Sequence, residues 1–176
     1  MENTKSNFRN LIRERRSGGK SKFDFNLLIS SPDFQVAQVV ASYRSYGNEP
    51  DTKELNELIL GASKRLLLPV LKPDHSLEFR SWSGDLTSLK VNGKIEEPIG
   101  REFSGAIDMM VVPALAIDKS GNRLGQGGGS YDRTLDKFKG FSVALINEDE
   151  LVDQLPTESS DRRVSAALTP TRLIRF

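Results

Sequence analysis

The sequence predicts a single α/β domain covering residues 1–176, a three-layer α/β/α sandwich around a mainly parallel sheet. Two strand-helix-strand units are the basis of this prediction. In the first, a helical pattern at Asp51–Ala62 is followed by the apolar run Arg65–Leu71. In the second, the helical pattern Tyr131–Phe138 lies between the apolar runs Ile107–Val112 and Phe141–Ile146. Such units place their strands parallel with a right-handed crossover, so helices are expected on the faces of the sheet.

The N-terminal part is expected to form two helices and a strand before the first of these units is complete. Residues Thr4–Arg16 predict a basic helix that ends at Ser17-Gly-Gly, with Lys5, Arg9 and Arg13 repeating every fourth position on one face. The elements expected after it are a helix at Phe23–Ser30 and a strand at Gln35–Arg44 that is rich in Val, Ala and Tyr. The helix Asp51–Ala62 is supported by Leu55, Leu58 and Ile59 at helical spacing.

The remaining segments complete the sheet. A short strand is expected at Leu77–Trp82, and the polar, loop-rich segment Ser83–Gly105 is a candidate rim or lid. Two short strands are expected at the end of the chain, at Ser165–Thr169 and Arg172–Phe176. In a parallel α/β sheet, ligands bind beyond the carboxyl ends of the strands, which is where the glycine-rich segment after Val112 begins.

Composition excludes several classes of function. Lys and Arg number 25 against 24 Asp and Glu, so the net charge of +1 gives no reason to expect nucleic-acid binding. Without Cys there are no disulfides, thiolate metal sites or Cys nucleophiles. His75, the single imidazole, lies in a polar turn and is given no catalytic role. The N-terminus is polar and no apolar run approaches the roughly 18 residues of a membrane span. A cytoplasmic protein with no membrane partner is therefore expected, and a monomer is expected because the sequence shows no obvious apolar patch.

The most informative segment is the glycine-rich loop between Arg123 and Arg133. Gly125, Gly127, Gly128 and Gly129 can adopt positive φ and direct successive N–H groups into one concavity. The two arginines can supply charge-assisted hydrogen bonds to phosphate, and the helix that follows adds a favourable dipole. The loop predicts a nucleotide-phosphate site, although a flexible turn is the alternative interpretation.

Two common nucleotide motifs nearly match and are rejected. Ser17-Gly-Gly-Lys-Ser21 contains Gly-Lys-Ser, but a P-loop requires glycine where this chain has Glu14, and a strand rather than a helix before it. The loop Gly125–Ser130 fails the dinucleotide fingerprint because its last position is Ser. A nicotinamide or flavin enzyme is not expected.

The longer pattern around the loop resembles the 5-formyltetrahydrofolate cyclo-ligases, also called methenyltetrahydrofolate synthetases. The segments that carry the resemblance are Val112-Pro-Ala-Leu-Ala-Ile-Asp118, Gly121-Asn-Arg-Leu-Gly-Gln-Gly-Gly-Gly-Ser-Tyr-Asp-Arg133, Lys5-Ser-Asn-Phe-Arg9 with Arg13 and Arg16, Tyr43, Glu49-Pro-Asp-Thr52, Leu77-Glu-Phe-Arg-Ser-Trp82, Glu97-Pro98 and Leu155-Pro-Thr-Glu-Ser-Ser-Asp161. The resemblance covers nearly the whole chain and implies an α/β/α sandwich.

The resemblance also implies a reaction. Members of the family use ATP and Mg²⁺ to close 5-formyltetrahydrofolate to 5,10-methenyltetrahydrofolate, with release of ADP and phosphate. The formyl oxygen is phosphorylated, N10 attacks the activated carbon, and phosphate leaves. No protein nucleophile is needed, which agrees with a chain that lacks Cys and has one His, because phosphoryl transfer depends on positioning and charge neutralisation.

Site residues follow from the resemblance, position by position. The ATP-binding set it implies is Lys5, Arg9, Arg123, Leu124, Gly125, Gln126, Gly127, Gly128, Gly129, Ser130 and Tyr131. The catalytic set is Arg123, Tyr131 and Arg133, and the substrate-binding set is Glu49, Arg44, Trp82, Gln126, Gly127 and Gly128. Asp132 and Asp161 correspond to carboxylates that bind Mg²⁺.

Structural interpretations stand beside these roles. Lys5 and Arg9 could form a solvated basic face, to which Arg13 and Arg16 are assigned. Asp132 could be an acid of the first helical turn, and Trp82 could be core.

The chain departs from the family pattern at Ser130, Ser160 and Arg44, where an aromatic residue, His and an apolar residue are more usual. These departures affect the fit of the substrate more than ATP binding. A nucleotide- or folate-binding regulatory protein with weakened catalysis is therefore the alternative to a working ligase.

Overall fold

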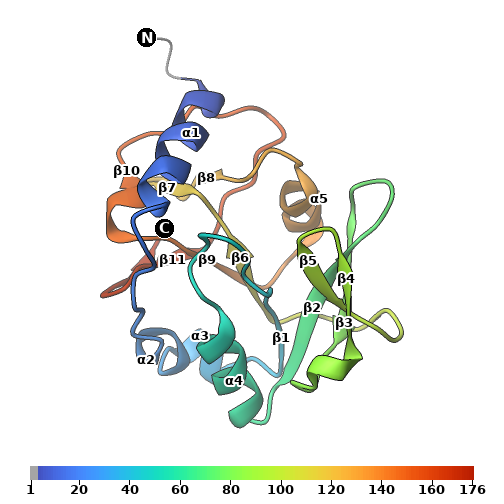
Figure 1. Cartoon of the computed structure of the whole chain (residues 1–176). Helices are drawn as coiled ribbons and strands as arrows, with labels where there is room; N and C mark the ends of the chain where they lie inside the picture. Colours follow the sequence, from blue (N-terminus) through green and yellow to red (C-terminus); the bar gives the residue numbers. More distant parts are fainter. Residues whose placement is uncertain (1–3) are drawn as a thin grey trace.

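The computed structural model describes residues 4–176 and contains a central seven-stranded sheet in the order β12-β11-β9-β6-β1-β2-β3 (Figure 1). The strands are β1 (Val39–Ala41), β2 (Arg65–Leu71), β3 (Leu77–Ser81), β6 (Met109–Pro113), β9 (Phe141–Leu145), β11 (Ala166–Leu168) and β12 (Leu173–Arg175). The five inner strands are parallel, and the edge strands β3 and β12 are antiparallel to their neighbours. This confirms the predicted α/β class with a mainly parallel sheet.

Alternate residues of the inner strands enter two separate hydrophobic clusters, one on each face of the sheet. Met109 and Val111 of β6 belong to one cluster, while Met110 and Val112 belong to the other. The first face is covered by α2 (Asn26–Ile29), α3 (Pro32–Val36) and α4 (Lys53–Gly61), and the second by α5 (Ser130–Lys137). Burial on both faces explains why β6 is a continuous apolar run rather than an alternating one.

The face that carries α5 also carries a small second sheet, which the sequence did not predict. It comprises β7 (Ala116–Asp118), β8 (Arg123–Leu124) and β10 (Leu151–Val152), in the order β10-β7-β8. The helix α1 (Lys5–Arg16) packs on this sheet through Ile12, which is buried in one cluster with Leu115, Ala116, Leu124 and Leu155. The glycine-rich loop therefore leaves β8, not the central strand β6, and enters α5 directly.

A buried ion pair fixes the C-terminal end of α1. Arg16 donates to both carboxylate oxygens of Glu150, at 2.7 and 2.8 Å, and also to the carbonyl of Ala114 at 2.7 Å. Both side chains are almost fully buried, at 4% and 1% exposed. Glu150 ends the 3₁₀ turn η2 (Glu148–Glu150), whose N-cap residue Asn147 donates to the same carboxylate. The assignment of Arg16 to a solvated face was therefore wrong.

The predicted strand Gln35–Arg44 is wrong at both ends. Residues Pro32–Val36 form α3, because Ser31 caps the helix by accepting a hydrogen bond from the N–H of Phe34 and proline occupies the first turn. The strand β1 keeps only three residues. The predicted helix Phe23–Ser30 is likewise shortened to the four residues of α2.

The segment Ser83–Gly105 is more ordered than the loop that the sequence predicted. It contains the 3₁₀ turn η1 (Leu86–Ser88) and an antiparallel hairpin of β4 (Leu89–Asn92) and β5 (Ile95–Pro98). The two-residue turn of the hairpin begins at Gly93, whose φ of 64° is one that glycine adopts without steric cost. Buried Glu97 attaches the hairpin to the central sheet by accepting a hydrogen bond of 2.9 Å from the N–H of Leu71.

None of the helices within residues 4–176 combines the length and the apolar character that crossing a bilayer requires.

Replacing Arg16 by Met should lower the free energy of unfolding by about 3–5 kcal/mol, because it leaves the carboxylate of Glu150 buried without its cation. Arg15→Met is the matched control on the next residue. Arg15 is half exposed and lies 3.6 Å from Asp149, so its loss should cost less than about 1 kcal/mol. Denaturant unfolding of both variants measures the difference; equal losses would contradict the role assigned to the buried pair.

Candidate functional site

A cavity of about 490 Å³ lies beyond the carboxyl ends of the parallel strands. Its walls include Tyr43 after β1, Pro113 at the end of β6, and Pro69 and Leu71 of β2. β1 is the strand at which the order of the sheet reverses, since β2 lies on one side and β6 on the other. Ligands of parallel α/β sheets bind at this point, so the position of the cavity matches the position that the sequence predicted.

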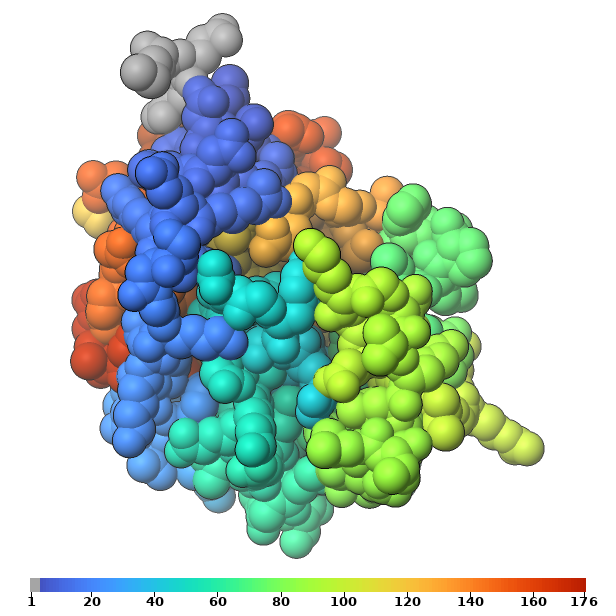
Figure 2. Space-filling view, in the orientation of Figure 1, coloured from blue at the N-terminus to red at the C-terminus, as the bar shows by residue number. Residues whose placement is uncertain are grey.

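Three segments that are distant in the sequence surround the cavity. They are the glycine-rich loop, the segment that follows β1 and the β4–β5 hairpin. Figure 2 shows them side by side on the face turned to the viewer, in gold, teal and yellow-green respectively. The α1 helix adds Lys5 and Arg9, and the C-terminal segment adds Glu158 and Asp161.

The glycine-rich loop presents backbone N–H groups that no other part of the described chain uses. Within residues 4–176, the N–H groups of residues 125–132 donate no hydrogen bond. The carbonyl groups of the loop, in contrast, accept from arginines: Gly125 from Arg9 at 2.9 Å and Gly128 from Arg133 at 3.1 Å. The loop thus directs its carbonyls to side chains and leaves its N–H groups available to a ligand, at the start of α5.

Two glycines of this loop have backbone conformations that other residues rarely adopt. Gly127 has φ of 115° and Gly129, the N-cap of α5, has φ of 69°. No side chain caps α5, so the first N–H groups of the helix belong to the same free set. The predicted positive-φ glycines are therefore confirmed at these two positions, whereas Gly125 and Gly128 have ordinary φ.

The basic face of α1 lies against the loop and the C-terminal segment. Lys5 lies between two carboxylates, 2.7 Å from Asp161 and 3.0 Å from Glu158. Burial acts to lower the pKa of Lys5, but its hydrogen bonds to Asp161 and Glu158 outweigh burial and raise the pKa above its ordinary value. Arg13, which the sequence assigned to solvent, donates to the side-chain oxygen of Gln126 at 2.9 Å. Lys5, Arg9 and Arg13, spaced by four, therefore lie on the face of α1 that contacts the glycine-rich loop and the C-terminal segment.

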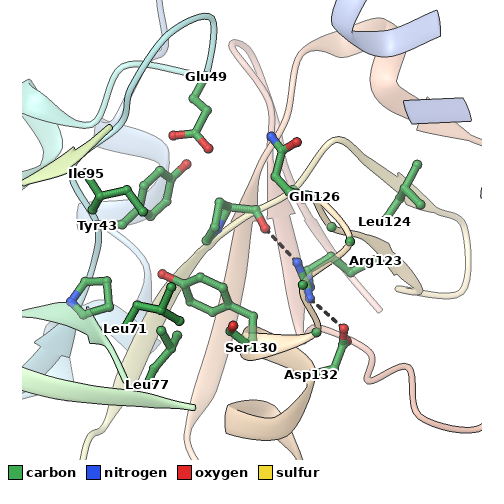
Figure 3. A pocket seen from close by; sticks show the side chains of 18 of the residues that line it. Tyr43, Glu49, Leu71, Leu77, Ile95, Arg123, Leu124, Gln126, Ser130 and Asp132 are labelled. Atoms are coloured by element: carbon green, nitrogen blue, oxygen red, sulfur yellow. Dashed lines mark hydrogen bonds and ion pairs between the residues drawn. The ribbon is translucent and has the colours of Figure 1, made fainter. Parts of the chain in front are cut away.

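Arg123 forms the buried end of the cavity (Figure 3). It is 6% exposed, donates to the carbonyl of Pro113 at 3.0 Å and lies 3.2 Å from the carboxylate of Asp132. Its guanidinium carbon also lies 5.8 Å from the centre of the Tyr131 ring. Its Nε is buried and has no partner among the described residues. Gly125 makes this position possible, because a Cβ there would lie 2.7 Å from the Arg123 Nη1.

The two aspartates assigned to a metal both line the cavity, and each already faces a cation. Asp161 contacts Lys5, and this contact lowers the pKa of the Asp161 carboxyl although partial burial opposes the shift. Asp132 contacts Arg123 and accepts from the N–H of Arg162 at 3.2 Å. Within residues 4–176 no three acidic, His or Cys side chains gather into a metal-binding group. The donor set suits Mg²⁺, which commonly takes one or two carboxylates together with waters and phosphate oxygens.

The opposite end of the cavity is apolar, with one buried acid. Leu71, Leu77 and Ile95 line this end together with Tyr43. Glu49, 7% exposed, accepts from the N–H of Tyr46 at 3.0 Å. Burial raises the pKa of the Glu49 carboxyl above its ordinary value, although this hydrogen bond partly opposes the shift.

Two residues predicted for the site lie outside the cavity. Trp82 is buried and donates from its indole N–H to the carbonyl of Asp85 at 2.9 Å, and the guanidinium of Arg44 lies 5.2 Å from its ring centre. Arg133 supports the glycine-rich loop from outside through the carbonyl of Gly128. Neither side chain reaches the cavity, so the substrate-binding role of Trp82 and the catalytic role of Arg133 receive no support.

Sequence reasoning also missed residues that the structure places in the cavity. Ile95 and Glu96 reach it through the hairpin, and Glu96 pairs with Arg44 at the edge of the cavity at 2.5 Å. The alternating segment around Asn92-Gly93 is the signal that could have revealed this hairpin. Tyr43 was noted only as part of the family pattern and was given no role.

Comparison with known proteins identifies the family that the sequence resembles. A model of the 5-formyltetrahydrofolate cyclo-ligase family matches residues 4–170. A 5-formyltetrahydrofolate cyclo-ligase of Mycolicibacterium smegmatis is 34% identical over 145 residues, covering 77% of this chain and 75% of that protein. One from Escherichia coli K12 is 33% identical over 155 residues, covering 83% and 85%. The solved structure of Aquifex aeolicus 5,10-methenyltetrahydrofolate synthetase superposes with a TM-score of 0.80 at 27% identity, covering 97% of this chain and 92% of that one.

Gly125→Ala should lower the free energy of unfolding by about 1–3 kcal/mol, because the added methyl group overlaps the buried guanidinium of Arg123. Gly128→Ala is the matched control in the same loop. Its Cβ would meet only the Ser130 hydroxyl at 3.9 Å, so its effect should stay within about 0.5 kcal/mol. Chemical denaturation of the two variants tests the close approach, which is refuted if Gly125→Ala is as stable as Gly128→Ala.

Glu49→Gln should be more stable than the wild type at pH 7, and its advantage should shrink as the pH falls to about 4. The pKa of Glu49 is raised in the folded state, so the folded protein holds this proton more tightly than the unfolded chain. The resulting stabilisation is present at low pH and lost as the pH rises through the folded-state pKa. Glu57→Gln, which removes an exposed carboxylate of α4, controls for the lost charge. Unfolding free energies measured from pH 4 to 8 would refute burial as the cause if both variants behaved alike.

Proposed function

This chain belongs to the 5-formyltetrahydrofolate cyclo-ligase family, and from that premise we propose that it closes 5-formyltetrahydrofolate to 5,10-methenyltetrahydrofolate with ATP and Mg²⁺. ADP and phosphate are the other products. The observation that carries the proposal is the row of free N–H groups at residues 125–132 in a cavity that also contains Lys5 and Arg9. Free N–H groups at a helix N-terminus with two cations nearby are suited to a polyphosphate.

The two ends of the cavity suit the two substrates. The glycine-rich loop, Lys5 and Arg9 form the polar end, which we assign to the phosphates of ATP. The apolar end contains Leu71, Leu77 and Glu49. It suits a flat heterocycle whose faces are apolar and whose edge carries hydrogen-bonding groups. Gln126, Gly127 and Gly128 also line the cavity and are assigned to both ligands, as the family resemblance implies.

The chain's own residues would act by positioning and by balancing charge. The formyl oxygen attacks the γ-phosphorus and displaces ADP; N10 then forms a bond to the formyl carbon, loses its proton, and the phosphorylated oxygen leaves as phosphate. Phosphoryl transfer and the departure of phosphate both place negative charge on phosphate oxygens, so fixed donors that need no rearrangement lower the energy of these two steps. Arg123, buried and held by Pro113 and Asp132, and the loop N–H groups are the donors fixed in this way. Tyr131 packs against Arg123 and contributes to its position.

Asp132 and Asp161 would hold Mg²⁺, whose chemical contribution when bound is to neutralise phosphate charge. Both carboxylates now contact cationic side chains, Arg123 and Lys5, that also line the cavity. The opposing charges are thus already arranged in pairs, and a phosphate that approached Lys5 would leave Asp161 free to bind a metal ion.

Purified protein given 5-formyltetrahydrofolate, ATP and Mg²⁺ should develop the ultraviolet absorbance of the methenyl product, and it should not do so when ATP is omitted.

Lys5→Met should raise the KM for ATP about tenfold or more, because it removes a phosphate donor and leaves Asp161 and Glu158 to repel the nucleotide. Lys53→Met, on the exposed surface of α4, is the matched control and should leave this KM unchanged.

Nucleotide binding without product would refute the ligase proposal and favour a binding protein. An unchanged KM in Lys5→Met, with product still formed, would refute only the assignment of the phosphate end.

A further inference from the structure

The hydroxyl of Tyr43 is buried and makes no hydrogen bond within the described residues. The side chain is 4% exposed, and it belongs to the wall of the cavity. A buried hydroxyl without a partner costs about 1–3 kcal/mol, and buried polar groups in folded proteins are rarely left in this state. The O–H of Tyr43 is therefore a hydrogen-bond donor that the described part of the chain does not use.

The backbone holds this hydroxyl in one place. The carbonyl of Tyr43 accepts two hydrogen bonds, from the Thr52 hydroxyl at 2.7 Å and from the Asn56 amide at 3.0 Å. Both donors are at the start of α4 and are buried. Because the main chain is fixed by a helix and the ring is packed in the core, the hydroxyl is positioned before any ligand binds.

The carboxylate of Glu49 is the ionisable group that acts most strongly on this hydroxyl. Figure 3 shows the Tyr43 hydroxyl pointing toward the Glu49 carboxylate, with Ile95 beside the Tyr43 ring and Leu71 and Leu77 below it. One Glu49 oxygen is bound by the N–H of Tyr46, and no hydrogen bond links Glu49 to Tyr43. A fixed donor and a fixed acceptor thus lie close together without satisfying each other.

We propose that the Tyr43 hydroxyl and the Glu49 carboxylate act as a donor–acceptor pair that recognises the lactam edge of the substrate's 2-amino-4-oxo pteridine ring. This inference rests on the proposed function and adds Tyr43 to it as a specificity-determining residue. A lactam edge carries an N–H next to a C=O. The carboxylate accepts from the ring N–H, and the hydroxyl donates to the neighbouring carbonyl oxygen.

The chemistry of the pair fits this role. Burial, reinforced by the negative charge of Glu49, raises the pKa of the Tyr43 hydroxyl well above its ordinary value, so the group remains a donor at neutral pH. The nearby Leu71, Leu77 and Ile95 provide an apolar surface for the face of the ring. The buried Tyr43 hydroxyl adds discrimination, because a ligand that offers it no acceptor leaves it unbonded.

Tyr43→Phe should raise the KM for 5-formyltetrahydrofolate about two- to tenfold, the effect of one neutral hydrogen bond, while kcat and the KM for ATP stay unchanged. Its melting temperature should equal or exceed that of the wild type, because the deleted hydroxyl has no partner in the fold. Ser42→Ala is the matched control. It deletes the buried, equally unpaired hydroxyl of the preceding residue, which does not line the cavity, and the KM for the folate should not change.

Equilibrium binding of 5-formyltetrahydrofolate without ATP provides a second measurement. A wild type that binds and converts the folate, with a Tyr43→Phe variant of identical KM and affinity, would overturn the inference and leave the proposed function standing. A lower melting temperature with an unchanged KM would assign Tyr43 a structural role and also overturn it. A wild type that neither binds nor converts the folate would refute the proposed function, and the inference with it.

Discussion

The position of α1 depends on the buried ion pair between Arg16 and Glu150. A helix of twelve residues that packs through one fully buried side chain, Ile12, has little apolar surface with which to fix its orientation. The bidentate pair and the bond from Arg16 to the Ala114 carbonyl fix the C-terminal end of α1 to η2 and to the segment that follows β6. A buried pair of this kind contributes mainly a unique geometry, because its desolvation offsets most of its attraction. Here that geometry brings Lys5 and Arg9 to the cavity.

Unpaired polar atoms concentrate where the sheet meets the cavity. Among the described residues, the buried side-chain atoms without partners are the Ser42 and Tyr43 hydroxyls, the Asn56 carbonyl oxygen and the Arg123 Nε. The first three lie at or against the end of β1, and the fourth is at the base of the glycine-rich loop, where the free N–H groups begin. Other buried polar side chains among the described residues are hydrogen-bonded. Asp118, for example, accepts four hydrogen bonds. Tyr43 and Arg123 line the cavity, so a ligand there can complete their hydrogen bonding, whereas Ser42 and Asn56 do not line it.

The sequence was sufficient for elements whose periodicity is long and for residues whose spacing places them on one helical face. It located β2, α4, α5 and the basic face of α1, each with seven or more residues of consistent pattern, and it also located the shorter strands β3, β6, β9, β11 and β12. It failed where tertiary contacts decide. Ser31 and Pro32 start a helix that continues into the first two residues of the predicted strand Gln35–Arg44. The strands β7, β8 and β10 of the second sheet, with two or three residues each, were not predicted. Arg123 and Arg133 both flank the glycine-rich loop, so the sequence alone could not distinguish their roles. In the structure Arg123 is buried at the cavity, whereas Arg133 supports the loop from outside. Tyr43 could not be recognised either, since a missing hydrogen bond has no signature in a sequence.

Charge balance distinguishes the cations that line the cavity. Lys5, Arg44 and Arg123 each contact a carboxylate, so redirecting any of them to an anionic ligand leaves that carboxylate without its partner. Arg9 contacts only the neutral carbonyl of Gly125 in the bonds formed within residues 4–176, and a phosphate that replaced this carbonyl would leave no buried charge behind. The cost of redirecting Arg9 is therefore the smallest of the four. Because the same carbonyl belongs to the residue that must be glycine for Arg123 to fit, a ligand contact at Arg9 acts on the end of the loop that also holds the buried guanidinium. Arg9 of α1 and the buried guanidinium of Arg123 thus lie against the same residue, Gly125.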